Sequence, residues 1–279
     1  MHCARAIAVA ALLLGLASEA PAEELPVVLQ PAFEEGVRAL KAGKLAEAEA
    51  TFLRVLQQGG KAAYVHNNLG IVYQQRGRHR EAVAQFREAI RLDPAYAAPR
   101  VLLGASLLAL DRVGESITQL EQAVKLLPME PLARSQLARA YERAGRWTGA
   151  VEQYRALKDL APGDPEYAYL LGRAYLRHSE WCLRELKRID PGSARLQQAL
   201  GHNYRVQGRT DQAVRAFERA LAADPGLPEV HLALAQIYVE QKLWAEARQE
   251  IERELTLVPE SAGARALARR LLAEEAKSP

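Results

Sequence analysis

A histidine and a cysteine lie close enough in the sequence to suggest a chemical site. His178 and Cys182 are four residues apart, a spacing that places two side chains on the same face of a helix. Such a pair is half of a zinc site or a thiolate–imidazole pair, but no third or fourth ligand follows at a matching spacing. Cysteine is also commonly a small buried hydrophobic residue. We therefore interpret the pair as structural and predict no metal site.

The common catalytic motifs do not occur. The sequence has no GxGxxG run after a strand, no P-loop, and no HExxH, CxxC or GxSxG motif. The repeats described below also leave no stretch long enough to fold a catalytic domain. We therefore expect a protein that is not an enzyme and that needs no cofactor.

The composition excludes several classes of protein. With 49% hydrophobic and 25% charged residues, the 279-residue chain has an ordinary globular composition. A net charge of +3 is no nucleic-acid footprint, and two cysteines cannot supply a disulfide framework. Abundant Ala, Leu and Arg favour helix over sheet.

An internal repeat of 34 residues organises the chain. Gly70 and Gly104 are 34 residues apart, as are Tyr141 and Tyr175. Within residues 63–96, apolar or small residues recur every three or four positions in two blocks, which a glycine turn separates. This pattern predicts two amphipathic helices per repeat.

The repeat resembles the tetratricopeptide repeat (TPR), which has Leu-Gly and Tyr in its first helix, Ala and Phe in its second, and Pro at its end. The clearest copies contain Leu69, Gly70, Tyr73, Ala82, Phe86, Ala89 and Pro94, and then Leu200, Gly201, Tyr204, Ala213, Phe217, Ala220 and Pro225. The resemblance implies an all-α, right-handed superhelical solenoid of antiparallel helix pairs. Its small residue at the eighth position lets the two helices of a repeat approach closely.

The resemblance divides the chain into seven repeats. They are a degenerate repeat at 29–62, repeats at 63–96, 97–130 and 131–164, a truncated repeat at 165–193, and repeats at 194–227 and 228–261. Residues 262–279 are expected to form a capping helix and tail, because the last repeat of such an array needs a polar outer face.

The truncated repeat lacks five residues and its turn glycine. Apolar residues continue through it at spacings of three and four. We predict either one helix from about Glu166 to Ile189 or a helix pair with a very tight break at Ser179. Either arrangement divides the array into an N-terminal and a shorter C-terminal stack.

Residues 1–22 resemble a secretory signal peptide. Arg5 precedes a twelve-residue apolar run that ends at Ala17, and cleavage is expected after Ala22. The run is shorter than the ~20 residues of a membrane-spanning helix, although an uncleaved anchor is the alternative. We expect an exported protein, either periplasmic or extracellular, which contacts a membrane only if this segment is retained.

The resemblance implies a concave groove that is lined by the first helix of each repeat. Its second, fifth, ninth, twelfth and thirteenth positions are expected to face a partner. The predicted groove residues are Tyr64, Asn67, Gln74, Leu108, Arg139, Arg143, Tyr169, Arg173, Arg177, Arg195, His202 and Arg205.

The arginines of this set give two interpretations. Arg139 and Arg173 are one repeat apart, as are Arg143 and Arg177, so each pair is expected to form a ladder. Guanidinium groups pair well with carboxylates, which predicts an extended acidic partner segment. The alternative is a solvated charged face neutralised by neighbouring glutamates. Of the clamp that some TPR proteins use for a C-terminal carboxylate, only Asn68 is in place, because the preceding repeat has Phe33 and Val37 and the following repeat has Ala98 and Leu102 at the other positions.

Three classes of function follow from this sequence. We predict a protein–protein interaction scaffold of the cell envelope, with a protein or peptide partner and self-association as a further option. The alternative is an assembly module of a larger envelope or secretion complex, acting through its ends or convex face. An RNA-binding helical repeat is a remote alternative, because the TPR pattern and the near-neutral charge argue against it.

Overall fold

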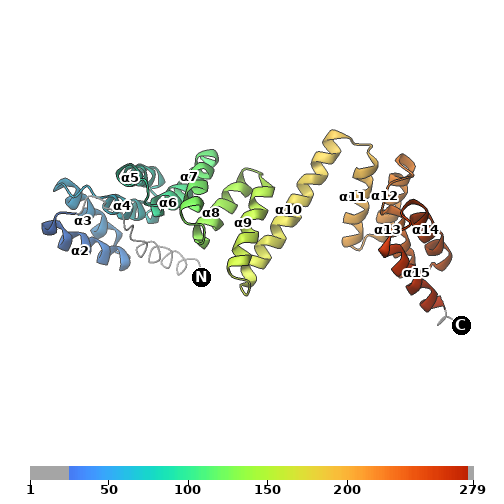
Figure 1. Cartoon of the computed structure of the whole chain (residues 1–279). Coiled ribbons are helices and arrows are strands. Elements are labelled where there is room, and N and C mark those ends of the chain that lie inside the picture. Colours follow the sequence, from blue (N-terminus) through green and yellow to red (C-terminus); the bar gives the residue numbers. More distant parts are fainter. Residues whose placement is uncertain (1–24, 276–279) are drawn as a thin grey trace. The chain divides into compact units, whose positions relative to one another are not determined.

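The computed structural model describes residues 25–275, and every regular element in that range is helical (Figure 1). The elements are η1 (Val27–Leu29), α2 (Gln30–Lys41), α3 (Leu45–Gln57), α4 (Ala63–Gln75), α5 (His79–Leu92), α6 (Ala98–Ala109), α7 (Val113–Leu126), α8 (Pro131–Arg143), α9 (Trp147–Leu160), α10 (Pro165–Ile189), α11 (Ala194–Val206), α12 (Thr210–Ala223), α13 (Val230–Glu240), α14 (Trp244–Leu257) and α15 (Ala262–Glu275). The predicted all-α helical-repeat fold is confirmed.

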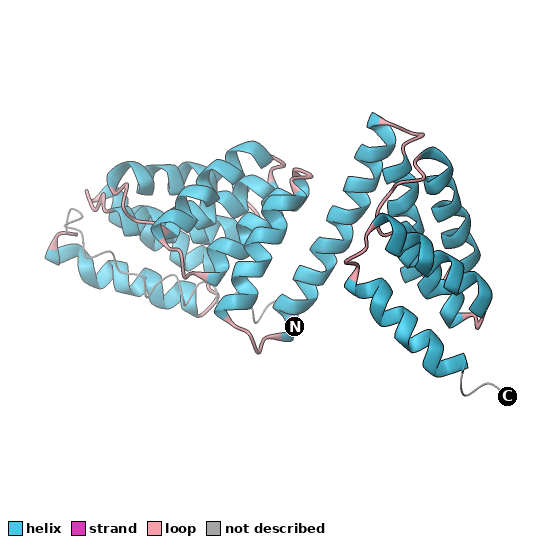
Figure 2. Cartoon of the chain, turned by 45° about the vertical axis from the view of Figure 1, so that its right-hand side comes forward, coloured by secondary structure: helices cyan, strands magenta, loops and turns pink. Residues whose placement is uncertain are grey.

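Consecutive helices form hairpins. The pairs are α2 with α3, α4 with α5, α6 with α7, α8 with α9, α11 with α12, and α13 with α14. Short loops join the two helices of each pair (Figure 2). At these turns Gly77 and Gly208 have φ angles of 72° and 70°, a left-handed conformation that glycine adopts without steric cost. Asp111 and Lys242 take the same place in their hairpins with φ angles of 59° and 60°.

The signature glycines allow the close helix contact that the sequence predicts. A β-carbon placed on Gly70 would lie 2.5 Å from the ring of Phe86, and one on Gly201 would lie 2.5 Å from the ring of Phe217. Both phenylalanines are fully buried. The aromatic ring of the second helix therefore fills the space that the missing side chain leaves on the first.

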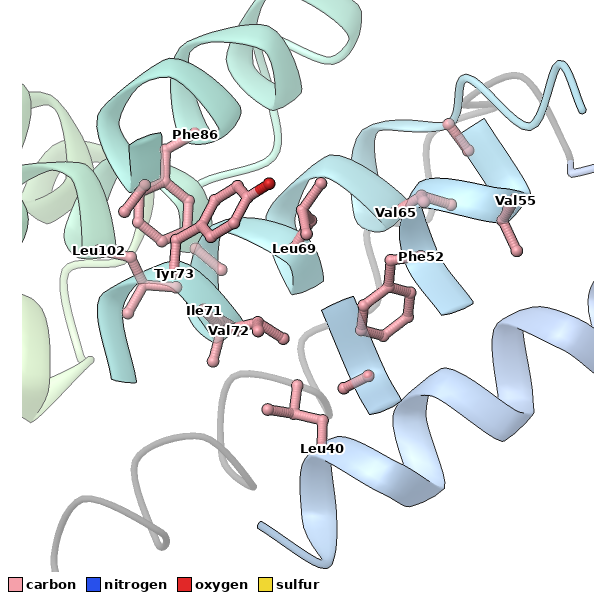
Figure 3. Close-up of a cluster of buried hydrophobic side chains, with 14 of the residues drawn as sticks. Leu40, Phe52, Val55, Val65, Leu69, Ile71, Val72, Tyr73, Phe86 and Leu102 are labelled. Atoms are coloured by element: carbon pink, nitrogen blue, oxygen red, sulfur yellow. The ribbon is translucent and has the colours of Figure 1, made fainter. Parts of the chain in front are cut away.

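The largest core cluster runs through the first three hairpins (Figure 3). Phe52 of α3, Leu69 of α4 and Phe86 of α5 are fully buried in it, and Leu102 of α6 extends it to the third hairpin. These three hairpins thus bury their apolar faces against one another, as a solenoid requires.

The truncated repeat is one unbroken helix, α10, of 25 residues. The single-helix alternative is confirmed, and no break occurs at Ser179. Ala174 is the buried residue of this helix, and Gly172, at the position of the signature glycine, has no atom within 4 Å of a β-carbon built on it. With the second helix of the repeat missing, no aromatic ring packs against this glycine.

The chain divides within α10 into two compact units. The N-terminal unit extends to His178, and the C-terminal unit begins at Ser179. The C-terminal unit has its own core, in which Phe217, Leu227 and Ile237 are buried.

The predicted signal segment, residues 1–22, lies outside the described residues. Within residues 25–275 no helix combines the length and the apolar character that crossing a membrane requires.

Candidate functional site

A cavity of about 420 Å³ opens in the N-terminal unit between the first helices of two successive hairpins. Three small or apolar residues of α6 and four polar residues of α8 line it: Ala105, Leu108, Ala109, Gln136, Arg139, Glu142 and Arg143. The lining residues of each helix recur at spacings of three and four, which places them on one helical face. An apolar wall therefore lies opposite a row of charged and polar side chains.

The start of α8 is well defined by its sequence. Pro131 occupies the first turn, where its missing N–H costs no hydrogen bond, and the carboxylate of Glu130 accepts a hydrogen bond from the backbone N–H of Leu132 at 3.0 Å. Buried Ala133 and Leu137 pack α8 against its neighbours. The N-terminus of α8 is thus capped and its buried face packed, while the residues that line the cavity lie further along the helix.

Two of the cavity's charged side chains already have partners. Arg143 Nη2 lies 2.5 Å from Asp111 Oδ1, in a pair whose side chains are 58% and 76% exposed. Glu142 Oε1 accepts a hydrogen bond from Arg173 Nη2 at 3.1 Å. Exposed ion pairs such as Arg143–Asp111 contribute little to stability. Arg143 can therefore exchange Asp111 for another carboxylate at small cost.

Arg139 differs from these residues. Its side chain is exposed, and its guanidinium group makes no hydrogen bond or ion pair with any residue in the range 25–275. Leu108, also in the cavity lining, is half-buried. The cavity therefore combines an unpaired guanidinium group with an apolar contact surface.

A buried tyrosine of the adjacent core, Tyr154 of α9, interacts electrostatically with Glu142. Burial, together with the charge of Glu142, raises the pKa of Tyr154 to about 12, and Arg173 opposes the shift. Tyr154 is 1% exposed, so its phenol stays protonated at neutral pH. Glu142 therefore acts electrostatically on Tyr154 and pairs with Arg173, and it lines the cavity together with Arg139 and Arg143.

The family follows from comparison with known proteins. The tetratricopeptide repeat model matches residues 33–97, 101–165 and 199–262, which together make up more than half of the chain. The chain belongs to the tetratricopeptide repeat family. The longest unmatched stretch between these ranges contains most of α10, where the TPR pattern is interrupted.

Solved TPR structures are similar to this chain in fold. The C-terminal part of a TPR-containing protein from Cytophaga hutchinsonii has 17% identity and a TM-score of 0.50, over 84% of this chain and 98% of that one. MamA has 20% identity and a TM-score of 0.45, over 71% of this chain and 92% of that one. YrrB, described as a TPR protein with an unusual peptide-binding site, has 20% identity and a TM-score of 0.44, over 71% and 87%. No curated protein matches the chain.

The predicted groove residues of the second TPR hairpin serve packing in this structure. The sequence predicts that Asn67 faces the groove, but its side chain is only 1% exposed. It is buried because its helix, α4, contacts helices of the hairpins on both sides. Gln74 Nε2 donates to Ser106 Oγ at 3.0 Å and thereby joins two hairpins. The hydroxyl of Tyr64 accepts a hydrogen bond from the backbone N–H of Leu25 at 3.2 Å.

The predicted residues of α10 in the N-terminal unit are exposed but do not line the cavity. Tyr169 is 63% exposed, and Arg177 is also on the surface. Arg173 reaches the cavity indirectly, through its ion pair with Glu142. The expected ladder of Arg139 with Arg173 is therefore interrupted by a carboxylate.

The remaining predicted residues lie in the C-terminal unit. Arg195 Nη1 donates to Gln198 Oε1 at 2.9 Å, and Arg205 pairs with Glu240 at 3.1 Å. The ring of His202 packs edge-on against Phe217 with a centroid distance of 5.0 Å. Burial and then the nearby Arg205 hold the pKa of His202 below its ordinary value, so this imidazole is neutral at pH 7.

Asp111 is a neighbour of the cavity that is not among the predicted site residues. It occupies the turn position where most hairpins have glycine, and its side chain points to Arg143 of the next hairpin. A charged residue at a position where other repeats have glycine is the sequence signal that distinguishes it.

Cys182 is a free, partly buried thiol. Within residues 25–275 no group of three or more acidic, His or Cys side chains is placed to hold a metal ion.

Proposed function

We propose that this chain is a non-catalytic adaptor of the cell envelope that binds an extended acidic segment of a partner protein in the α6–α8 cavity. TPR domains are, in general, non-catalytic modules for protein–protein interaction, and the family match carries this coarser conclusion. Export to the envelope rests on the signal-like residues 1–22. The acidic character of the partner rests on the cavity.

The unpaired guanidinium group of Arg139 is the observation that carries this proposal. A carboxylate bound between Arg139 and Arg143 would form charge-assisted hydrogen bonds, which are stronger than neutral ones. Leu108 on the opposite helix would contact an apolar side chain of the same peptide. Glu142 is paired with Arg173, so part of its negative charge is neutralised before the ligand arrives.

A peptide titration tests the proposal. We would measure the fluorescence anisotropy of a labelled peptide containing glutamates and one leucine as the full chain is added. Removing one charge-assisted contact costs roughly 1.5–3 kcal/mol, so Arg139→Ala is expected to raise Kd about tenfold or more. Arg139→Lys should recover part of the affinity, because an ammonium group keeps the charge but loses the planar fork.

The matched control is Arg80→Ala, which removes an exposed arginine from the second helix of a hairpin in the same unit. Its Kd should equal that of the wild type. Equal binding of a peptide in which glutamine replaces every glutamate, or an unchanged Kd in Arg139→Ala, would refute the proposed function.

A further inference from the structure

A second cavity, of about 400 Å³, lies entirely within the C-terminal unit. His202 of α11, Leu232 and Gln236 of α13, and Glu254 of α14 line it, together with Glu229 and Gly263 at the starts of α13 and α15. No lysine or arginine is among its lining residues. The lining therefore carries two carboxylates and one neutral imidazole.

Glu254 is buried, and one of its two carboxylate oxygens has no hydrogen-bond partner among the described residues. The residue is 1% exposed, and its Oε2 makes no hydrogen bond to any described residue. Burying a carboxylate is energetically unfavourable unless a positive charge or hydrogen-bond donors compensate it. One turn earlier on the same helix, Glu250 shows the compensated state: His231 Nδ1 lies 2.5 Å from one of its oxygens and Arg253 Nη1 2.7 Å from the other.

Packing does not require a carboxylate at this position. Five other hairpins have an apolar residue at the equivalent place, nineteen residues after the small residue of the first helix: Val55, Ala89, Ala123, Leu157 and Ala220. All five are fully buried. Glu254 departs from this pattern although burying its carboxylate is unfavourable, and it lies beside a cavity. This combination points to a ligand that compensates the buried charge.

The other lining groups determine the kind of ligand. The Oε1 of Gln236 accepts a hydrogen bond from Arg205, and Leu232 offers an apolar wall. Within residues 25–275 no acidic, His and Cys side chains are grouped so as to hold a metal ion. One buried carboxylate beside an apolar wall suits an organic cation, whose alkyl stem packs on the wall while its charged head reaches the oxygen.

We propose that this cavity binds an organic monocation, an ammonium or guanidinium group, with the Glu254 carboxylate as its counter-charge. Glu229 adds a second negative charge at the start of α13, and neutral His202 can accept a hydrogen bond from the ligand. Lysine or arginine side chains and free amines share this chemistry. The site is independent of the α6–α8 cavity, which lies in the other unit and has the opposite charge preference.

Calorimetric titration of the full chain tests this site with three probes: the peptide Gly-Gly-Lys-Gly-Gly, the same peptide with norleucine in place of lysine, and n-butylamine. We expect the lysine peptide to bind at least about tenfold more tightly than its norleucine analogue, because the analogue leaves the buried carboxylate unpaired. If the lysine peptide binds more tightly than n-butylamine, the natural ligand is a lysine side chain of a protein segment. If the two bind equally, the amine group alone is recognised. Both results support the site.

The decisive variants are Glu254→Gln and Glu254→Ala. Each should lower the affinity for the lysine peptide at least about tenfold. The matched control Glu252→Gln removes an exposed carboxylate from the same helix, changes the net charge equally, and should bind like the wild type. Because alanine occupies this position in three other hairpins, Glu254→Ala is expected to fold, as circular dichroism would verify. Equal affinity for the two peptides, or undiminished binding by both Glu254 variants, would overturn the proposal.

Discussion

At the scale of single residues, the role of each glycine depends on whether a second helix packs against it. Gly201 lies against Phe217 so closely that an added β-carbon would be 2.5 Å from the ring. Gly172 occupies the corresponding place in α10, yet nothing lies within 4 Å of a β-carbon there. The same sequence position is therefore constrained in one repeat and unconstrained in the other.

Alanine substitutions should separate these two environments. We expect Gly201→Ala to lower the free energy of unfolding of the C-terminal unit by roughly 1–3 kcal/mol, because the new methyl group overpacks the contact with Phe217. Gly172→Ala should raise stability by about 0.4–1 kcal/mol, since it only restricts the unfolded chain. Urea unfolding followed by circular dichroism measures both changes.

The glycine pair has its own control, because the two variants make the same chemical change. Equal destabilisation by both would show that the helix contact is not what constrains Gly201. A stabilising effect of Gly201→Ala would contradict the described packing outright.

The sequence predicts contacts within one hairpin better than it predicts whether a side chain is exposed. The sequence correctly indicated that Gly70 and Gly201 touch the second helix, since that contact is local to one hairpin. It did not reveal that Asn67 is 1% exposed, because this depends on helices of the adjacent hairpins. Glu254 was also overlooked, although its place among apolar equivalents is visible in the sequence.

At the scale of elements, α10 departs from the hairpin pattern. Its apolar spacing continues across the place of the missing turn, and this local signal was sufficient to predict a helix near residues 166–189. The same spacing also allows a very tight break at Ser179, because no local rule distinguishes such a break from a continuous helix. The structure gives 25 uninterrupted helical residues.

A proline in the middle of α10 tests whether this helix acts as a connector. Ser179→Pro removes the backbone N–H that bonds one turn earlier and should cost about 3 kcal/mol locally. Because the buried residue of α10 is Ala174, in the N-terminal unit, we expect the core amides of both units to keep their protection. Hydrogen exchange read by mass spectrometry would show faster exchange only around residues 176–183.

The control for this experiment is Ser179→Ala, which should leave exchange unchanged or slower. Loss of protection throughout α8 and α9, or throughout α11 to α14, would contradict the connector role, since it would mean that folding of a unit requires an intact α10.

At the scale of the whole molecule, the chain is a TPR array divided into two compact units. The predicted groove set is divided accordingly: Arg195, His202 and Arg205 belong to the C-terminal unit, and the others belong to the N-terminal unit. Periodicity indicates which face of each helix repeats along the array. It does not indicate where side chains of neighbouring hairpins enclose a cavity, or which arginine is left unpaired.

The central claim is that Arg139 recognises a carboxylate of a partner segment. The most direct measurement is a charge-swap cycle. Kd is measured for two proteins, the wild-type chain and Arg139→Glu. Each is titrated with an acidic peptide and with the same peptide in which lysine replaces the contacting glutamate. Arg80→Glu serves as the control for net charge. Residues in contact typically show coupling energies of about 0.5–3 kcal/mol in such cycles.

We predict that Arg139→Glu weakens binding of the acidic peptide and that the lysine peptide restores it, while Arg80→Glu shows no such rescue. Strictly additive effects, with the lysine peptide binding Arg139→Glu no better than it binds the wild-type chain, would contradict the account.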